Sequence, residues 1–278
     1  MVEAAGTAET FSAPDGTRLS ARVAGPENAP PLVLVHGFSM SSLLFEKQLS
    51  GPLSARFRVI APDLRGHGNS DPGSDLSALG RAETYAGDLK AAIASFARRD
   101  PIVAGWSFGG RVICAYLADG GAAAGAVFFA SVTDDVLPDG SRPHGPAAAV
   151  IADMCGADDL AAAHATVRFV DGMFAAPPDP SVRDLILAIA ASVPRNVRRN
   201  MRGLKSDNRA LLQSLAVPVL AIHGEADAVI RSEAAAATAD AAQHGSLMLM
   251  PGIGHAPFLE AQHVFDTALE RFAEHCGL

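Results

Sequence analysis

A serine between glycines, followed far downstream by an acid and then a histidine, is the combination in this sequence best suited to covalent chemistry. Ser107 lies in residues 105–110 (Gly-Trp-Ser-Phe-Gly-Gly), directly after an apolar run, and Asp227 and His255 each follow another apolar run. An imidazole can take the proton of an attacking hydroxyl and return it to the leaving group, while a carboxylate holds the imidazole in the useful tautomer. We therefore predict Ser107 as nucleophile, His255 as general base and acid, and Asp227 as the residue that orients His255.

The position of each of these residues supports this interpretation. All three are predicted to lie on loops at the C-terminal ends of strands, and in a parallel sheet such loops emerge along one edge. Gly105 and Gly109 lack the Cβ atoms that would clash where a strand and the next helix nearly touch. A serine that only caps the following helix is the alternative for Ser107.

Two upstream motifs extend the pattern. An apolar run at 32–35 leads into residues 36–39 (His-Gly-Phe-Ser), and residues 63–71 read Asp-Leu-Arg-Gly-His-Gly-Asn-Ser-Asp. With the chain order serine, acid, histidine, nearly the whole sequence resembles the α/β-hydrolase superfamily, in particular its serine-nucleophile, carboxylesterase-like branch with a helical cap. The resemblance implies an oxyanion hole formed by the backbone N–H groups of Phe38 and Phe108.

The resemblance also implies the reaction. We expect hydrolysis of a carboxylic ester of a small or medium, largely apolar substrate through an acyl-enzyme, with no cofactor and no metal. The same residues would support lactone hydrolysis, carbon–carbon bond hydrolysis or perhydrolysis without a cofactor. A ligand-binding receptor on this fold is the alternative of another class. Serine at position 107 argues against the related haloalkane dehalogenases and epoxide hydrolases, which place aspartate there.

Other residues compete for the roles of acid and base. Glu225 is two residues before Asp227, and Asp134 and Asp135 follow the sixth predicted strand, where some hydrolases place the acid. The resemblance favours Asp227, which precedes an apolar pair. It also assigns three histidines to hydrogen bonds with loop backbone; these are His36, His67 and His223.

The residues of the glycine-rich motif have two interpretations. Asp63, Arg65 and His67 either contact the substrate or hold the loop in shape through side-chain to backbone hydrogen bonds, and we expect the second.

Strand and helix signals alternate along the chain, which is typical of a doubly wound α/β fold. We predict a mostly parallel sheet of about eight strands, in which residues 11–23 form an edge hairpin that turns at 14–16. The other strands are predicted at 32–35, 58–61, 101–104, 125–131, 217–222 and 247–250, and helices at 83–97, 111–117 and 261–275.

The alternation stops between Asp134 and Asp207, where helix-forming stretches are broken by prolines. Because the family carries a helical cap after the sixth strand, we expect a core domain at 1–133 and 208–278 and a cap at 134–207. The apolar cap residues are expected mainly to pack with one another and with the core. The candidates for walls of a substrate pocket are Trp106, Phe169, Met173 and Phe174.

Four arginines in the predicted cap share one helix face, because Arg195, Arg198, Arg199 and Arg202 follow at intervals of three and four residues. We expect a solvated face; the alternative is a docking surface for an acidic partner or an anchor for an acidic substrate. The serine motif is also similar to that of esterases that release pimeloyl chains from an acyl carrier protein, but residues 36–39 lack the tryptophan of that subgroup.

Composition excludes several classes of function. A net charge of −8 over 278 residues argues against a nucleic-acid partner, because phosphate binding needs clustered positive charge. No apolar segment is long enough to span a bilayer, and residues 1–12 lack the pattern of a signal peptide. The three cysteines are too few for a disulfide framework or a zinc site; they are Cys114, Cys155 and Cys276. We expect a cytoplasmic protein with no membrane partner, and the sequence does not predict its oligomeric state.

Overall fold

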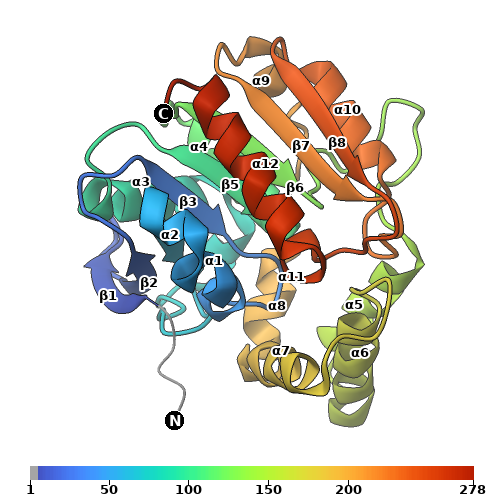
Figure 1. Cartoon of the computed structure of the whole chain (residues 1–278). Coiled ribbons are helices and arrows are strands. Elements are labelled where there is room, and N and C mark those ends of the chain that lie inside the picture. The colour runs from blue at the N-terminus through green and yellow to red at the C-terminus, as the bar shows by residue number, and fades with distance from the viewer. Residues whose placement is uncertain (1–5) are drawn as a thin grey trace.

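Eight strands form one sheet in the order β1-β2-β4-β3-β5-β6-β7-β8 in the computed structural model, which describes residues 6–278 (Figure 1). Only β2 runs antiparallel to its neighbours, and all other pairs are parallel, which confirms the predicted sheet. The strands are β1 (Thr7–Ser12), β2 (Arg18–Ala24), β3 (Pro31–Val35), β4 (Arg58–Pro62), β5 (Ile102–Trp106), β6 (Gly125–Phe129), β7 (Val219–Gly224) and β8 (Gly245–Met250). Residues 1–5, part of the stretch in which no signal peptide is expected, lie outside the described residues.

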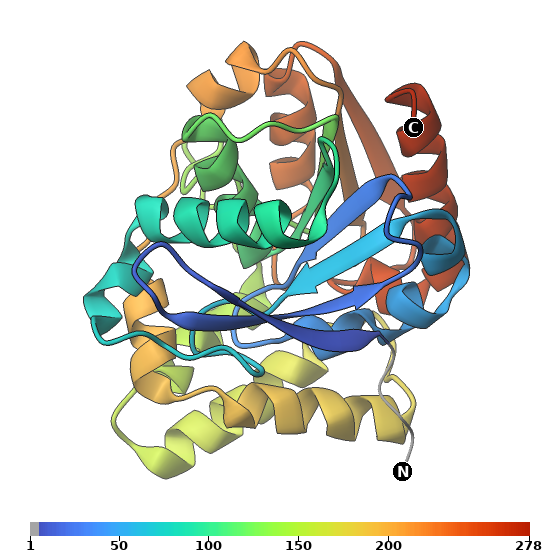
Figure 2. The same ribbon diagram turned by 90° about the vertical axis from the view of Figure 1, so that its left-hand side faces the viewer.

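Helices cover both faces of the sheet, so every residue of β3, β5 and β6 is buried (Figure 2). This explains why these strands read as continuous apolar runs. One face carries α1 (Glu46–Ser50), α2 (Pro52–Arg56) and α12 (Gln262–His275), and the other carries α3 (Ala82–Phe96), α4 (Phe108–Ala118) and α10 (Glu233–Ala241). The short helices of the main body are η1 (Ser42–Phe45), η2 (Leu76–Gly80), α9 (Arg209–Ser214) and α11 (Pro257–Glu260).

Residues 146–201, between β6 and β7, form a group of helices beyond the C-terminal edge of the sheet, coloured from olive green through yellow to light orange in Figure 1. These inserted helices are η3 (Pro146–Val150), α5 (Ile151–Met154), α6 (Asp159–Asp171), α7 (Pro180–Ser192) and α8 (Arg195–Met201). Residues 134–207, all of them described, contain no strand, and one isolated bridge joins His144 to Ile230. Because Gly145 N–H also donates to Val229 O at 2.8 Å, the first part of this segment is fastened to the loop after β7. The division into two domains at 134 and 207 stays a prediction.

Of the four arginines predicted to share a solvated face, Arg199 and Arg202 are exposed and Arg195 is half-buried, so the prediction fails only for Arg198. Arg198 is buried and donates to the carbonyl of residue 154, Arg199 donates to that of 155 at 3.0 Å, and Arg195 to those of 156 and 157 at 3.1 and 3.0 Å. Residues 154 and 155 end α5 and residues 156 and 157 follow it directly, so the guanidinium groups satisfy the carbonyls at and just beyond the C-terminus of this helix. Docking of an acidic partner on this helix stays a prediction.

Within residues 6–278, no helix combines the length and the apolar character needed to cross a membrane.

Candidate active site

Ser107 lies on a sharp turn between β5 and α4. Its backbone has φ 52° and ψ −116°, a conformation that a residue with a side chain adopts only at a cost. A Cβ on Gly105 would lie 2.5 Å from the carbonyl carbon of Gly109, which confirms that the turn requires glycine there. The Ser107 side chain makes no capping hydrogen bond to α4, so the structure does not support a capping role for its hydroxyl.

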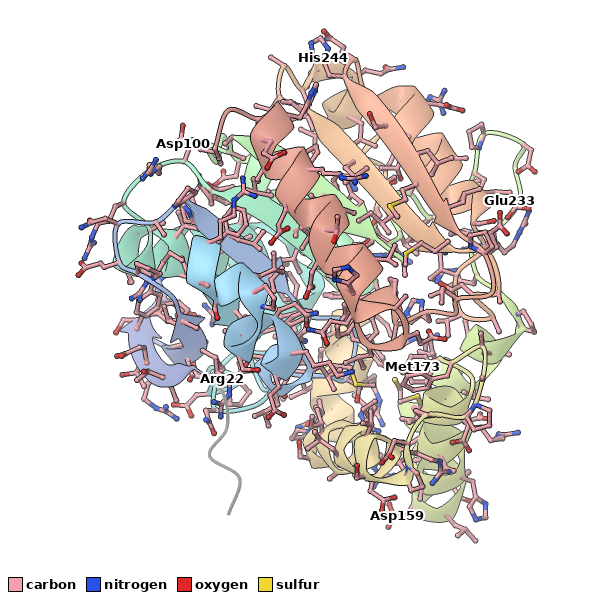
Figure 3. The ribbon with its side chains drawn as sticks, viewed as in Figure 1. Arg22, Asp100, Asp159, Met173, Glu233 and His244 are labelled. Carbon is pink, nitrogen blue, oxygen red and sulfur yellow. The ribbon has the colours of Figure 1, made fainter. Side chains whose placement is uncertain are left out.

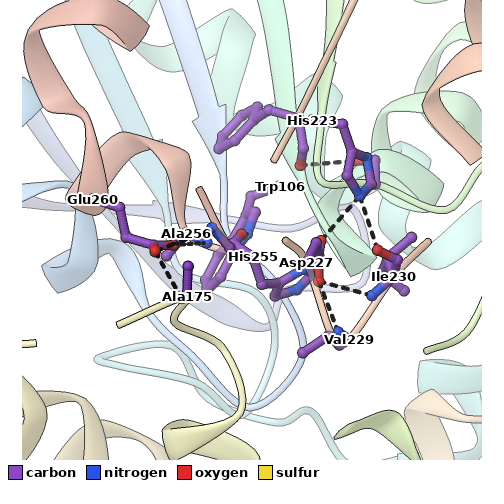
Figure 4. Close-up of polar contacts among 12 residues, drawn as sticks. Trp106, Ala175, His223, Asp227, Val229, Ile230, His255, Ala256 and Glu260 are labelled. Atoms are coloured by element: carbon purple, nitrogen blue, oxygen red, sulfur yellow. Dashed lines mark hydrogen bonds and ion pairs between the residues drawn. The ribbon is translucent and has the colours of Figure 1, made fainter. Parts of the chain in front are cut away.

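Asp227 and His255 are brought together by the loops after β7 and β8 (Figure 4). The Nδ1–H of His255 donates to Asp227 Oδ2 at 2.7 Å, and Asp227 Oδ1 accepts the N–H groups of Val229 and Ile230 at 2.7 and 2.9 Å. Both side chains are buried. This pair has the geometry in which a carboxylate orients an imidazole and stabilises its protonated form.

His223 is a third member of this group that the sequence analysis assigned only to backbone contacts. Its Nε2 lies 3.0 Å from Ile230 O, as expected, and also 3.0 Å from Asp227 Oδ2 (Figure 4). Burial acts to raise the pKa of Asp227, but His255 and His223 outweigh it and hold the pKa below its usual range. Asp227 therefore remains ionised while it accepts all four contacts.

The competing acids lie elsewhere. Asp134 Oδ1 accepts the backbone N–H of Asn208 at 2.7 Å, and Asp135 forms an ion pair with Arg111 at 2.7 Å. Glu225 is exposed. None of the three carboxylates forms a hydrogen bond or ion pair with His255 in the part of the chain that the structure describes.

Trp106 connects Ser107 to the loop that carries His255. Its Nε1–H donates to His255 O at 2.8 Å, and the two rings lie 5.4 Å apart. No hydrogen bond joins Ser107 Oγ to His255 within residues 6–278. In unliganded sites such contacts are often long and tighten when the substrate binds.

Glu260 holds the loop that carries His255 on the side away from Trp106, and its role could not be read from the sequence. Its carboxylate accepts the N–H groups of Gly254, Ala256 and Ala175 at 3.1, 3.2 and 2.9 Å. His255 N–H donates to Met173 O at 2.7 Å. The base is thus held between its own loop and residues 173–175 of the inserted segment, where Met173 lies at the junction of the two parts and Asp159 at the outer end (Figure 3).

A cavity of about 450 Å³ opens beside Ser107, and Phe38 and Phe108 line it together with the serine. Of the four predicted wall residues, only Phe169 lines it. Trp106 and Met173 are buried against the His255 loop and Phe174 packs against the core, so these three do not line this cavity, and their assignment to a substrate pocket stays a prediction. The other apolar lining residues are Val132, Ala148, Ala149, Ile151, Ala152, Met201, Leu204, Val229 and Ile230.

The loop at 63–71 serves structure, as expected. Asp63 accepts the backbone N–H groups of Ser42 and Asn69 at 2.8 and 3.0 Å. The buried Arg65 binds Asp88 of α3 through two nitrogens, at 2.5 and 2.7 Å, and it also pairs with a carboxylate of the β1–β2 turn. Neither Asp63 nor Arg65 lines the cavity beside Ser107.

His36 and His67 form a buried pair whose ring centroids lie 5.1 Å apart. His36 Nδ1–H donates to Gly37 O at 2.9 Å while its Nε2 accepts Leu64 N–H at 3.0 Å, and His67 Nδ1–H donates to Arg65 O at 2.8 Å. These contacts confirm the predicted backbone role. Burial lowers the pKa of His36 to about 4 and that of His67 to about 3, the latter with a smaller effect of His36.

The buried pair His36 and His67 leads us to expect that the free energy of unfolding falls in acid. An unfolded imidazole binds a proton near pH 6.5, whereas His36 and His67 stay neutral in the fold until far lower pH, so the unfolded chain gains protons as the pH falls. Between pH 7 and 4.5 we expect each histidine to remove about 2 to 3 kcal/mol from the free energy of unfolding. Urea denaturation at both pH values should show a smaller loss in His67→Gln than in the wild type, with the exposed His164→Gln as control. Equal losses in all three proteins would contradict this account.

No group of three or more His, Cys, Asp or Glu side chains in residues 6–278 is arranged to hold a metal ion.

The model of the alpha/beta hydrolase family matches residues 32–268. The chain is 29% identical to a non-heme chloroperoxidase from Burkholderia pyrrocinia over 275 residues, which cover 90% of this chain and 94% of that protein. It is 26% identical to the bifunctional esterase/perhydrolase DCH from Acinetobacter calcoaceticus, over 90% of this chain and 94% of that protein. The solved structure of the esterase RhEst1 from Rhodococcus sp. ECU1013 superposes with a TM-score of 0.88 at 30% identity, covering 95% of this chain and 98% of that one.

The family match spans far more than half of the chain, and the strand order and the turn at Ser107 agree with it. The protein is therefore an enzyme of the alpha/beta hydrolase family.

Proposed function

We propose that this enzyme hydrolyses a carboxylic ester through an acyl-enzyme formed on Ser107. The observation that carries the proposal is the buried Asp227–His255 pair, held beside the turn that presents Ser107 to a largely apolar cavity. The similarity to RhEst1, an esterase, agrees with this choice. The apolar lining favours a small or medium, largely apolar substrate. A cytoplasmic location stays a prediction.

In the first step, Ser107 Oγ attacks the ester carbonyl while His255 Nε2 takes the hydroxyl proton. The backbone N–H groups of Phe38 and Phe108 stabilise the oxyanion, and Asp227 stabilises the imidazolium. The proton then passes to the leaving alcohol, which departs. Water, deprotonated by His255, attacks the acyl-enzyme, and the acid leaves as Ser107 recovers its proton.

In this mechanism the inserted helices act as a cap over the cavity. Phe169 of α6 and Met201 of α8 line the cavity together with residues 144, 145, 148, 149, 151 and 152. These side chains cover the ester from the side opposite the sheet, where they would exclude bulk water from the reacting carbonyl.

The experiment that tests this function is covalent trapping combined with turnover. We expect hydrolysis of 4-nitrophenyl esters, with rates that decline once the acyl chain outgrows the cavity. A phosphonofluoridate should abolish this activity and add one adduct, located by peptide mass spectrometry on Ser107. Turnover without an adduct on Ser107 would contradict the mechanism, and the absence of both would favour the receptor alternative.

A second candidate is perhydrolysis, in which hydrogen peroxide replaces water in the attack on the acyl-enzyme and a peracid is released. It is favoured by the similarity to a non-heme chloroperoxidase and to a bifunctional esterase/perhydrolase. Bromination of monochlorodimedone in the presence of acetate, bromide and peroxide measures the peracid. Lactones and carbon–carbon bonds are alternative substrates for the same residues.

A further inference from the structure

The cavity beside Ser107 is basic although the protein is acidic. The whole chain contains 30 Asp and Glu residues against 22 Lys and Arg. Among the described residues, the cavity lining contains one carboxylate, that of Asp135, and four permanent cations. These cations are Arg111, Arg142, Arg202 and Lys205.

The four cations differ in their partners. Arg111 is neutralised by Asp135, at 2.7 Å, and its other nitrogen donates to Leu204 O at 2.8 Å. Arg142, Arg202 and Lys205 are exposed and form no ion pair with any residue from 6 to 278. The lining therefore carries three positive charges that nothing in the described chain neutralises.

These charges come from separate parts of the fold. Arg142 lies on the segment that pairs with the loop after β7, whereas Arg202 and Lys205 follow α8. His144 also lines the cavity, and burial, Arg111 and Arg142 lower its pKa against the opposing effect of Asp135. Cations that converge on one cavity from different elements create a positive potential inside it.

We propose that this cavity selects esters that carry a carboxylate in addition to the scissile bond, and that Arg142, Arg202 and Lys205 bind this carboxylate. This proposal rests on the proposed ester hydrolysis at Ser107. Charge-assisted hydrogen bonds from guanidinium and ammonium groups would hold one end of the substrate, and the apolar lining would hold the chain that joins the two groups. The same cations offset the repulsion between the carboxylate and the oxyanion that develops near Ser107.

A matched pair of chromogenic esters tests this selectivity. Mono(4-nitrophenyl) adipate and 4-nitrophenyl hexanoate share the leaving group and the acyl length and differ only in the terminal carboxylate. At low ionic strength we expect kcat/KM for the adipate ester to exceed that for the hexanoate ester by about tenfold. The ratio should fall towards one in concentrated salt, because exposed charges are screened.

Substitutions test whether the preference for the adipate ester depends on the cations that line the cavity. Arg142→Gln and Lys205→Gln should each lower the ratio of the two kcat/KM values by about threefold. Arg209→Gln is the control, because Arg209 is exposed, lies four residues beyond Lys205 and does not line this cavity. We expect the ratio of this control to equal that of the wild type.

The outcomes separate this inference from the proposed function. Turnover of both esters that depends on Ser107, with a ratio near one that salt does not change, would overturn the inference and leave ester hydrolysis standing. If neither ester is hydrolysed, ester hydrolysis fails, and calorimetric binding of the two esters to the wild type decides the selectivity of the cavity. Tighter binding of the adipate ester supports it, and equal or weaker binding overturns it.

Discussion

Replacing Ser107 with alanine is expected to lower kcat for ester hydrolysis by about 10⁴-fold or more, because no acyl-enzyme can form. The fold should persist. The substitution keeps the Cβ and the backbone conformation, and the backbone N–H of Ser107 still donates to Phe129 O at 3.1 Å. The measurement is single-turnover and steady-state hydrolysis of a 4-nitrophenyl ester, with the melting temperature recorded beside it.

Ser95→Ala is the matched control for this variant. Ser95 is exposed on α3, and its hydroxyl donates to Ala91 O, the preceding turn of the same helix. It should keep full activity. A Ser107→Ala protein that is folded and retains more than about a tenth of the wild-type rate would show that another residue is the nucleophile.

Asp227→Asn should lower kcat by about 10⁴-fold, the size of effect seen when an orienting acid becomes an amide. Because Oδ1 accepts two backbone N–H groups, the amide oxygen must take that side, and the amide NH₂ must face both His255 and His223. His255 Nδ1 can then only accept a hydrogen bond, which moves its hydrogen to Nε2, the atom that must receive the proton of Ser107.

The contact with His223 adds a cost in stability. In this variant His223 Nε2 faces both the new amide NH₂ and Ile230 O. A protonated Nε2 can donate to the carbonyl but not accept from the amide, and an unprotonated Nε2 can only accept from the amide, so one group stays unsatisfied in either tautomer. We expect a melting temperature lower by several degrees, about 1 to 3 kcal/mol for one unsatisfied buried group. Glu225→Gln, an equivalent change two residues away on an exposed side chain, should alter neither property. Equal losses of activity in both variants would contradict the assignment of Asp227.

Much of the fold could be predicted because its strands are buried on both faces. β3, β5 and β6 stand out as apolar runs, and the glycines around Ser107 mark a turn where backbone segments nearly touch. The helix α10 gave no such signal, since six of its nine residues are alanine and its sequence lacks a contrast between faces. The exposed first half of β1 is polar and was missed for the same reason.

Only the parts of the candidate site that follow from sequence motifs and their order along the chain could be predicted. The pairing of Asp227 with His255 follows from the motifs, but the contact with His223 depends on how two loops pack. Helical spacing placed Arg198 on a solvated face, and the structure buries it because α5 ends beside it. Spacing within a helix fixes which residues share a face, whereas the neighbour that meets that face is decided by tertiary packing.

The hydrogen bonds at residues 173–175 have a consequence for how substrate enters. Met173 O and Ala175 N are bonded to the loop of His255 and to Glu260, and a Cβ on Gly254 would lie 2.6 Å from Ala175 N. Lifting this edge of the inserted helices would displace the base. An opening that preserves catalysis must therefore keep the contacts at residues 173–175, so this edge of the inserted helices stays in place while substrate enters.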